Sequence, residues 1–260
     1  MTEHTTLQSA VHSAGVAELL WLSPGGPPGA VGVVPLVLGG RPAVALPWAH
    51  VATARAVAAS DTAALVLSDP RLTGSRWEPL VVTGRPSLVA DGAGDLFAEE
   101  LLDQELRKHP PARALADSPM LRREHWWYLP RLVLVLDPVE VSPGARREGP
   151  ADAVLGVDDG RLHVATVRVA DWDTDPLDLR GGPGSASGPA VLVGQEFSVP
   201  DVERWTVHTT TGRYADGQLT GVVPAPTRAL EPLPGLLARM RRQRSLERAC
   251  VSALRAAGHA

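Results

Sequence analysis

The chain has 260 residues, 44% of them apolar, and a formal net charge of −4 at pH 7. This length allows one large or two small domains with a hydrophobic core, and the acidic balance gives no whole-chain reason to expect nucleic acid or an anionic membrane as a partner. No apolar run approaches the roughly 20 residues that span a bilayer, and the N-terminus lacks a basic segment followed by an apolar one, so we expect a cytoplasmic protein. The single cysteine, Cys250, excludes an internal disulfide and a multi-cysteine metal site, and we expect no metal.

The first quarter of the chain predicts a helix, a three-stranded meander and a second helix. Apolar spacing and turn residues give these elements the ranges 5–14, 16–22, 31–38, 42–46 and 48–60. Gly39-Gly40 separates the second and third strands, and glycine takes positive φ freely at both positions of a two-residue turn. We therefore expect a β-hairpin at this point.

Residues 61–91 predict the strand pair around which the rest of the chain packs. Residues 63–67 are a short apolar run, typical of a strand buried on both faces, and residues 80–89 form the longer second strand. Gly84-Arg85-Pro86 interrupts that second strand. Because glycine marks a bulge and proline cannot donate to a ladder, we expect a bent strand at a sheet edge or a barrel corner.

A clear amphipathic helix is predicted over residues 95–108, with a leucine-rich stripe inside and four carboxylates facing water: Glu99, Glu100, Asp103 and Glu105. Residues 120–128 look like a connector, and residues 131–141 are the most strand-like run in the protein. The first domain is expected to cover residues 1–149.

The order of these elements resembles the FMN-binding split β-barrel superfamily, the relatives of pyridoxamine 5′-phosphate oxidase. Three segments carry the resemblance: Val33-Val34-Pro35-Leu36-Val37-Leu38, Thr53-Ala54-Arg55, and Val82-Thr83-Gly84-Arg85-Pro86-Ser87-Leu88-Val89. The match extends over residues 10–142. It implies a split β-barrel with flanking helices. Together with the second β-rich domain predicted below, which is interpreted as a degenerate repeat of the barrel or as unrelated to it, the fold class is α+β, mainly β.

The resemblance implies a flavin near a dimer interface, with its phosphate held by hydroxyl and basic side chains. Thr53 and Arg55 are the matching positions, and arginine offers a planar fork that suits phosphate. Where many relatives carry a serine and a lysine, this chain has Trp48, His50 and Val51. The cofactor is therefore expected to be FMN, with a deazaflavin, or no cofactor at all, as the alternatives.

The aromatic segment Trp126-Trp127-Tyr128, followed by Arg131, is the other concentrated feature, because the chain has seven tryptophans but only two tyrosines and two phenylalanines. Its rings suit a stacked flavin or substrate, but core or interface packing is the favoured interpretation. Arg76, Trp127 and Arg131 are kept as further candidates near the ring.

Residues 150–260 predict a second β-rich domain that ends in a long basic helix over 233–257. Arg76-Trp77 and Gly84-Arg85 recur with the same spacing as Arg204-Trp205 and Gly212-Arg213. A degenerate copy of the barrel is one interpretation, and chance in a glycine- and arginine-rich chain is the other. The basic helix is expected to pack on its own acidic domain or on a sister subunit.

These observations lead to a prediction of a flavin-binding oxidoreductase-like protein that passes hydride through FMN to a small substrate. The alternatives are a deazaflavin-dependent reductase with the same barrel, and a cofactor-free binding or dimerisation module. We expect a homodimer or an internal pseudo-dimer. No catalytic side chains are predicted, because a flavin carries its own redox chemistry.

Overall fold

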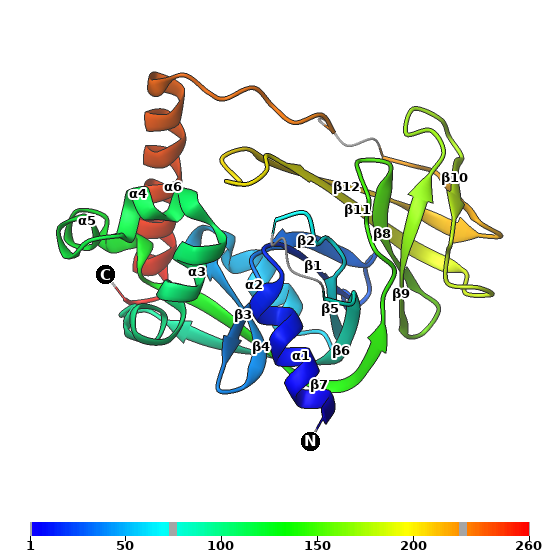
Figure 1. The fold of residues 1–260 in the computed structure, drawn as a ribbon, viewed down its shortest axis with the longest axis horizontal. Coiled ribbons are helices and arrows are strands. Elements are labelled where there is room, and N and C mark those ends of the chain that lie inside the picture. Colours follow the sequence, from blue (N-terminus) through cyan, green and yellow to red (C-terminus); the bar gives the residue numbers. More distant parts are fainter. Residues whose placement is uncertain (1, 73–76, 224–227, 260) are drawn as a thin grey trace.

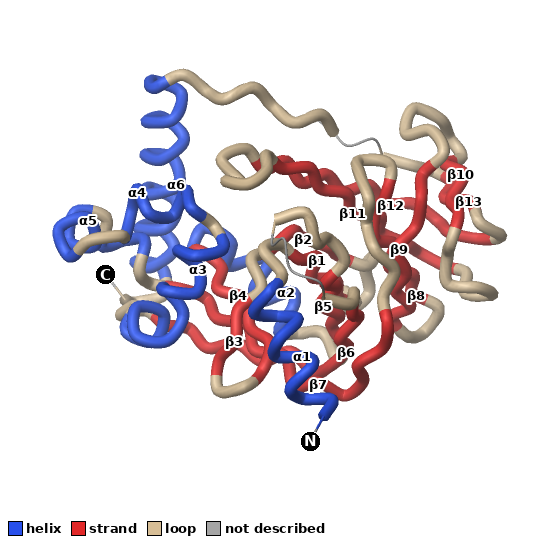
Figure 2. Tube along the Cα trace, viewed as in Figure 1, coloured by secondary structure: helices blue, strands red, loops and turns tan. Residues whose placement is uncertain are grey.

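The computed structural model describes residues 2–72, 77–223 and 228–259. In this structure 38% of the residues are in strands and 28% in helices, so the protein is mainly β, as predicted. Figure 1 shows two bodies of β-structure side by side, and Figure 2 shows that the helices gather around the first of them. The predicted division at Gly149 falls between the last strand of the first body and the first strand of the second.

Within the described residues, the first body is a seven-stranded sheet. Its strands are β1 (Ala17–Trp21), β2 (Gly29–Val33), β3 (Leu36–Leu38), β4 (Arg41–Pro47), β5 (Ala63–Leu67), β6 (Leu80–Asp91) and β7 (Arg131–Pro143). They are ordered β2-β1-β5-β6-β7-β4-β3. The hairpin predicted at Gly39-Gly40 is confirmed, with both glycines at positive φ between antiparallel β3 and β4.

The two edge strands of this sheet, β2 and β3, are consecutive in the chain. Only Val34 and Pro35 separate them, so the opposite edges of the sheet lie within about 11 Å of each other here. A sheet whose edges are joined by so short a link must curl round on itself. The single strand predicted over residues 31–38 is therefore two strands, broken where Pro35 lacks an N–H to pair, and the fold is a barrel split at this seam.

The prediction for β6 is half confirmed. The ladder between β6 and β7 shifts register between Thr83 and Gly84, and a Cβ at Gly84 would lie 2.1 Å from the Asp137 carbonyl oxygen. This is the expected bulge with close backbone approach. The strand as a whole is not at an edge, because β6 lies between β5 and β7. At Pro86, however, its side toward β5 is unpaired, since β5 pairs only as far as Gly84, so the expected edge position holds locally.

Helices cover the first sheet. They are α1 (Thr2–Ser13), α2 (Val51–Ala58), the π-helical turn η2 (Phe97–Leu101), α3 (Leu102–Lys108), α4 (Arg113–Ala116) and α5 (Pro119–Glu124), with 3₁₀ turns η1 (Trp48–His50), η3 (Pro110–Ala112) and η4 (Trp126–Tyr128). The helix predicted over 95–108 is confirmed and starts at a fixed point. The Asp91 carboxylate accepts the backbone N–H groups of Gly94 and Phe97, at 2.9 and 2.8 Å.

The second body is a closed barrel of six described strands. They are β8 (Asp152–Asp158), β9 (Leu162–Val169), β10 (Leu177–Arg180), β11 (Gly188–Phe197), β12 (Trp205–Ala215) and β13 (Gln218–Thr220). Their order is β10-β13-β12-β11-β8-β9, and pairing between β9 and β10 closes the barrel. A second β-rich domain is thus confirmed.

Alternate residues of the same strands face two different cores. Leu65 belongs to the core of the first sheet, whereas its neighbours Ala64 and Val66 pack against Val191 and Val193 of the barrel. Because successive side chains on a strand point to opposite faces, β5 is buried on both, as its apolar run predicts. The two domains are joined through this apolar layer.

The closing helix α6 (Leu236–Ala256) returns to the first domain. Its last turns bury Cys250 and Leu254 in the first core, while Leu236 and Leu237 near its start are exposed. The buried face therefore packs on the first domain and not on the acidic second domain. On the basic face, however, the Arg239 guanidinium lies 3.6 Å from the Glu203 carboxylate of the second domain, as part of that expectation requires. None of the described helices is long and apolar enough to cross a membrane.

Candidate functional site

A cavity of about 340 Å³ lies beside the end of β4 and the turn that follows it. We call it the Arg131 pocket. Its walls are mainly apolar and come from β2, β4, η3 and α6. Its polar and aromatic lining residues are His50, Thr53, Glu105, His109, Tyr128, Arg131 and Trp205.

The turn after β4 is anchored by Trp48. This side chain is 2% exposed, its ring packs edge-on against His259 with centroids 5.2 Å apart, and its indole N–H points to the Asp91 carbonyl oxygen at 3.5 Å. The anchored turn places His50 and then Thr53 along one wall of the pocket. A rigid element therefore presents both side chains.

Arg131 is the fixed charge of the pocket. Its side chain is 1% exposed, and its guanidinium lies over the rings of Tyr128 and Phe97, 3.9 and 4.3 Å from their centroids. Glu105 provides the counter-charge, with Oε1 3.5 Å from Arg131 Nη2. Glu105 also accepts the Tyr128 hydroxyl hydrogen bond. The group is rigid and its net charge is zero.

One hydrogen-bond donor of Arg131, its Nε, is buried and has no partner among the described residues. Leaving a buried N–H unpaired costs roughly 1–3 kcal/mol, which a polar ligand atom could recover.

Two histidines in the lining are kept neutral. Burial lowers the pKa of His50, and burial together with Arg131 lowers the pKa of His109 against the opposing influence of Glu105. The His109 ring lies 6.0 Å from that of Trp205, centroid to centroid, and the Trp205 indole N–H donates to Gln195 Oε1 at 3.0 Å. Since Trp205 belongs to β12, the second domain supplies part of the wall.

The structure separates the residues that the sequence singled out. Thr53 and Arg131 both line the Arg131 pocket. Arg55 is exposed and not in the lining, because residues two apart on a helix differ by about 200°. Trp127 is 1% exposed within the first core, with its ring edge-on to Tyr128. Arg76 lies outside the described residues.

Glu105 was expected to face water, and this expectation is wrong. The side chain is 6% exposed and bonded to Tyr128 and Arg131. A signal was present in the sequence: Glu105 follows Leu101 and Leu102 of the apolar stripe by four and three residues, which places it on their face of the helix. His109, the residue after this helix, also lines the pocket and is not among the residues that the sequence singled out.

The lining residues fit a flat ring better than a phosphate. A phosphate dianion calls for charge-assisted donors. The one cation in the described lining, Arg131, is already paired with Glu105, and both histidines are neutral. The Arg131 pocket therefore does not fit FMN held by its phosphate, whereas its apolar walls and free N–H fit an uncharged planar ring system.

Comparisons with known proteins find structural resemblance only. No family model matches the chain, and no curated protein matches it. Solved structures that resemble it include a conserved hypothetical protein from Mycobacterium tuberculosis, with 14% identity, a TM-score of 0.40, and coverage of 55% of this chain and 84% of that one.

Two further resemblances concern cofactor proteins. A pyridoxamine 5′-phosphate oxidase-related, FMN-binding protein from Nostoc punctiforme is 14% identical, with a TM-score of 0.33, over 79% of this chain and 94% of that one. A heme-binding protein from Mycobacterium smegmatis is 13% identical, with a TM-score of 0.37, over 96% of this chain and 97% of that one. At such low similarity these proteins do not assign a ligand to this chain.

Proposed function

We propose that the Arg131 pocket binds a planar, largely uncharged aromatic ring of the flavin type. The observation that carries this is the combination of apolar walls with a single buried guanidinium whose Nε has no partner among the described residues. Ligand pockets typically join apolar surfaces to a few fixed polar groups that orient the ligand. Arg131 and the neutral His109 are those groups here.

In this arrangement each side chain has a definite task. Arg131 Nε–H donates to an acceptor on the ring edge, while Glu105 and the two aromatic rings hold the guanidinium in place. Trp205 covers the ring from the second domain. A bound flavin or deazaflavin supplies hydride transfer, so the reaction class we propose is that of an oxidoreductase acting on a small substrate. The one cation in the described lining is already paired, so we propose that the pocket recognises the ring of a flavin rather than the phosphate of FMN.

An iron porphyrin is the second candidate. His50 and His109 line the same apolar pocket, and burial keeps both rings in the neutral form that can ligate iron. A porphyrin would give a sharp Soret band whose position changes when the ligating histidine is replaced.

The protein is also proposed to act as an internal pseudo-dimer. Strand β2 packs against β11 and β12, and a Cβ at Gly32 would lie 2.6 Å from Val207 and 3.3 Å from Trp205. One domain thus contributes the pocket and the other a wall. Sedimentation equilibrium, combined with the ring titration below, tests this. A monomer that binds the ring supports the proposal, and ring binding that occurs only in a homodimer contradicts it.

The ring proposal is tested by fluorescence titration with riboflavin, FMN, a deazaflavin and hemin at constant ionic strength. Riboflavin carries the ring without the phosphate, so we expect it to bind within about 3-fold of FMN. Two variants address the site: A45F, which fills the cavity from β4, and E105L/R131M, which removes both charges together. Each should weaken binding at least about 10-fold, whereas the control R55M, at an exposed position of α2, should not.

Other outcomes of this titration support a different ligand or no ligand at all. If FMN binds at least about 10-fold more tightly than riboflavin and R55M abolishes the difference, the phosphate is gripped by α2 and our proposal is wrong. Binding of hemin alone supports the second candidate. Failure of all four ligands supports a cofactor-free module.

A further inference from the structure

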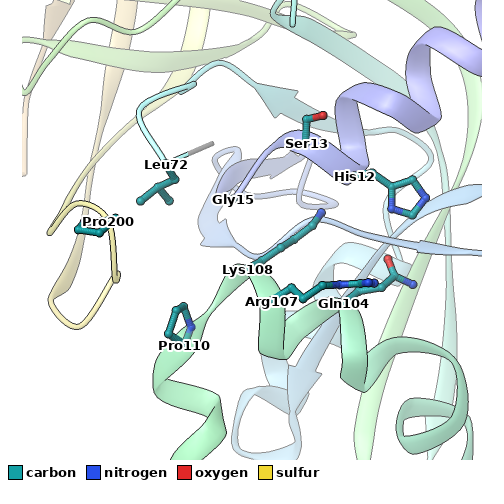
Figure 3. A pocket seen from close by; sticks show the side chains of 9 residues that line it. All are labelled: His12, Ser13, Gly15, Leu72, Gln104, Arg107, Lys108, Pro110 and Pro200. Atoms are coloured by element: carbon teal, nitrogen blue, oxygen red, sulfur yellow. The ribbon is translucent and has the colours of Figure 1, made fainter. Parts of the chain in front are cut away.

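A second cavity, of about 610 Å³, lies on the other side of the end of α3. We call it the Lys108 pocket, and Figure 3 shows it. Its lining residues are His12, Ser13, Gly15, Leu72, Gln104, Arg107, Lys108, Pro110 and Pro200. Lys108 and Pro110 line this cavity while His109, between them, lines the Arg131 pocket. The two sites therefore flank one short stretch of chain.

The charge of the Lys108 pocket is opposite in sign to that of the chain. His12, Arg107 and Lys108 line it, and none of the described lining residues is acidic, although the chain carries a net charge of −4. Ser13 adds a hydroxyl group. A concave surface with basic donors and no carboxylate attracts anions.

Lys108 is held rather than free to turn away. Its ammonium group donates hydrogen bonds to the carbonyl oxygens of Val11 and Pro35, which uses two of its three donors. Figure 3 shows the side chain extending from α3 toward the end of α1. Burial and Arg107 lower the pKa of Lys108 to about 7, so the local field already disfavours a cation there.

Arg107 and the protonated form of Lys108 repel each other, and no described lining residue offers a carboxylate between them. His12 is neutral at pH 7, like His50 and His109. Burial, Lys108 and Arg107 all lower the pKa of His12. Arg107, exposed on the last turn of α3, has no hydrogen bond or ion pair with any residue that the structure describes, so its whole planar fork is available. A multiply charged anion would relieve this repulsion and satisfy several donors at once.

Both domains form the walls. Gly15 packs on Leu72 so closely that an added Cβ would lie 2.7 Å from the leucine side chain, and Pro200 comes from the connection between β11 and β12. The cavity thus depends on the packing of the barrel against the first domain. A ligand bound here would stabilise that arrangement.

We propose that the Lys108 pocket binds a dianionic phosphate group, either as free phosphate or as the end of a small phosphate ester. Arg107 supplies the bidentate donor, the neutral His12 imidazole supplies one N–H, Lys108 in its protonated form supplies a third hydrogen, and Ser13 completes the set. This site is distinct from the Arg131 pocket and does not depend on a ring being bound there.

Isothermal titration calorimetry of the full chain tests this with inorganic phosphate, glycerol 3-phosphate and acetate at constant ionic strength. We expect both phosphates to bind and acetate, a monoanion, to bind at least about 10-fold more weakly. The variant R107Q should weaken phosphate binding about 10-fold and R107Q/H12Q about 100-fold. Lys108 is not replaced, because it also holds two backbone carbonyls.

R123Q is the matched control, since Arg123 is an exposed arginine on α5 outside this cavity. It should bind phosphate within about 2-fold of the unmodified protein. The ester binding more tightly than phosphate supports a phosphorylated small molecule, and equal binding supports free phosphate. No heat with either phosphate up to about 10 mM, or an equal loss in R123Q and R107Q, overturns the proposal.

Discussion

Arg147 donates a hydrogen bond to Glu18 at 3.0 Å, and both side chains are fully buried between the two domains. Glu18 lies on β1 and Arg147 on the connection to β8. Arg147 also donates to the carbonyl oxygens of Gln195 on β11, at 2.8 Å, and of Asp152 on β8, at 3.0 Å. A single guanidinium therefore links the sheet, the connection and the barrel.

The R147M variant should lose about 3–5 kcal/mol of unfolding free energy, because Glu18 is left buried without its counter-charge. Asp69, whose carboxylate lies 3.7 Å from Arg147 Nη1, also loses this ion pair. The carbonyl oxygens of Asp152 and Gln195 lose their hydrogen-bond donor. Urea unfolding followed by tryptophan fluorescence measures the change. R146M is the control, since Arg146 is exposed and makes one backbone contact, to Trp77. Equal losses in the two variants would contradict this account.

The local elements of this fold could be predicted from the sequence. Strand β5 has the predicted bounds, Ala63–Leu67, because apolar runs and turn residues are local signals. The break of the predicted strand 31–38 depends on something less local. Pro35 sits at the one place where the curled sheet needs the chain to pass from one edge to the other.

The buried charges could not be predicted in the same way. Glu105 looks like a solvent-facing helix residue until its partner Tyr128, 23 residues later, is known to lie against it. Arg147 stands in a segment with glycine, proline and charged residues that reads as a linker. In both cases a tertiary contact offsets the free-energy cost of burying the charge, and a single sequence does not show that contact.

Gly194 on β11 leaves room for the imidazole of its cross-strand partner, His208 on β12. A Cβ at Gly194 would lie 2.2 Å from His208 Nε2, and that ring cannot easily move because it packs edge-on to Trp172 with centroids 4.9 Å apart. G194A should therefore cost about 1–3 kcal/mol. The same change in an H208A background should cost under about 1 kcal/mol. Thermal unfolding of the four proteins completes the cycle, and additive effects would show that the two positions do not interact.

His208 should also make stability depend on pH. Burial, with repulsion from Arg147 and Arg228, lowers its pKa from 6.5 to about 4. Between these values the unfolded chain binds a proton that the folded protein does not, so the unfolding free energy falls as pH falls from 6.5 toward 4. After allowance for solvent screening we expect a loss of about 1–2 kcal/mol.

The control for this pH effect is H208F, which keeps an aromatic ring beside Trp172 and removes the titrating group. Urea unfolding at pH 7 and pH 5 should show a smaller decrease in H208F than in the unmodified protein. The same decrease in both proteins would assign the pH dependence to other groups.

The contribution of the Glu105–Arg131 pair to stability should be separable from its contribution to ligand binding. E105L leaves Arg131 charged and buried without its counter-ion, which should cost about 3–5 kcal/mol. E105L/R131M removes both charges, and replacing a buried pair by apolar side chains is often close to neutral. The double variant should therefore lie only about 1–2 kcal/mol below the unmodified protein, since the Tyr128 hydroxyl still loses its acceptor. Urea unfolding measures the stabilities, and riboflavin titration of the folded double variant measures the site. A double variant less stable than E105L, or one that binds the ring as well as the unmodified protein, would show that this pair does not serve the pocket as we propose.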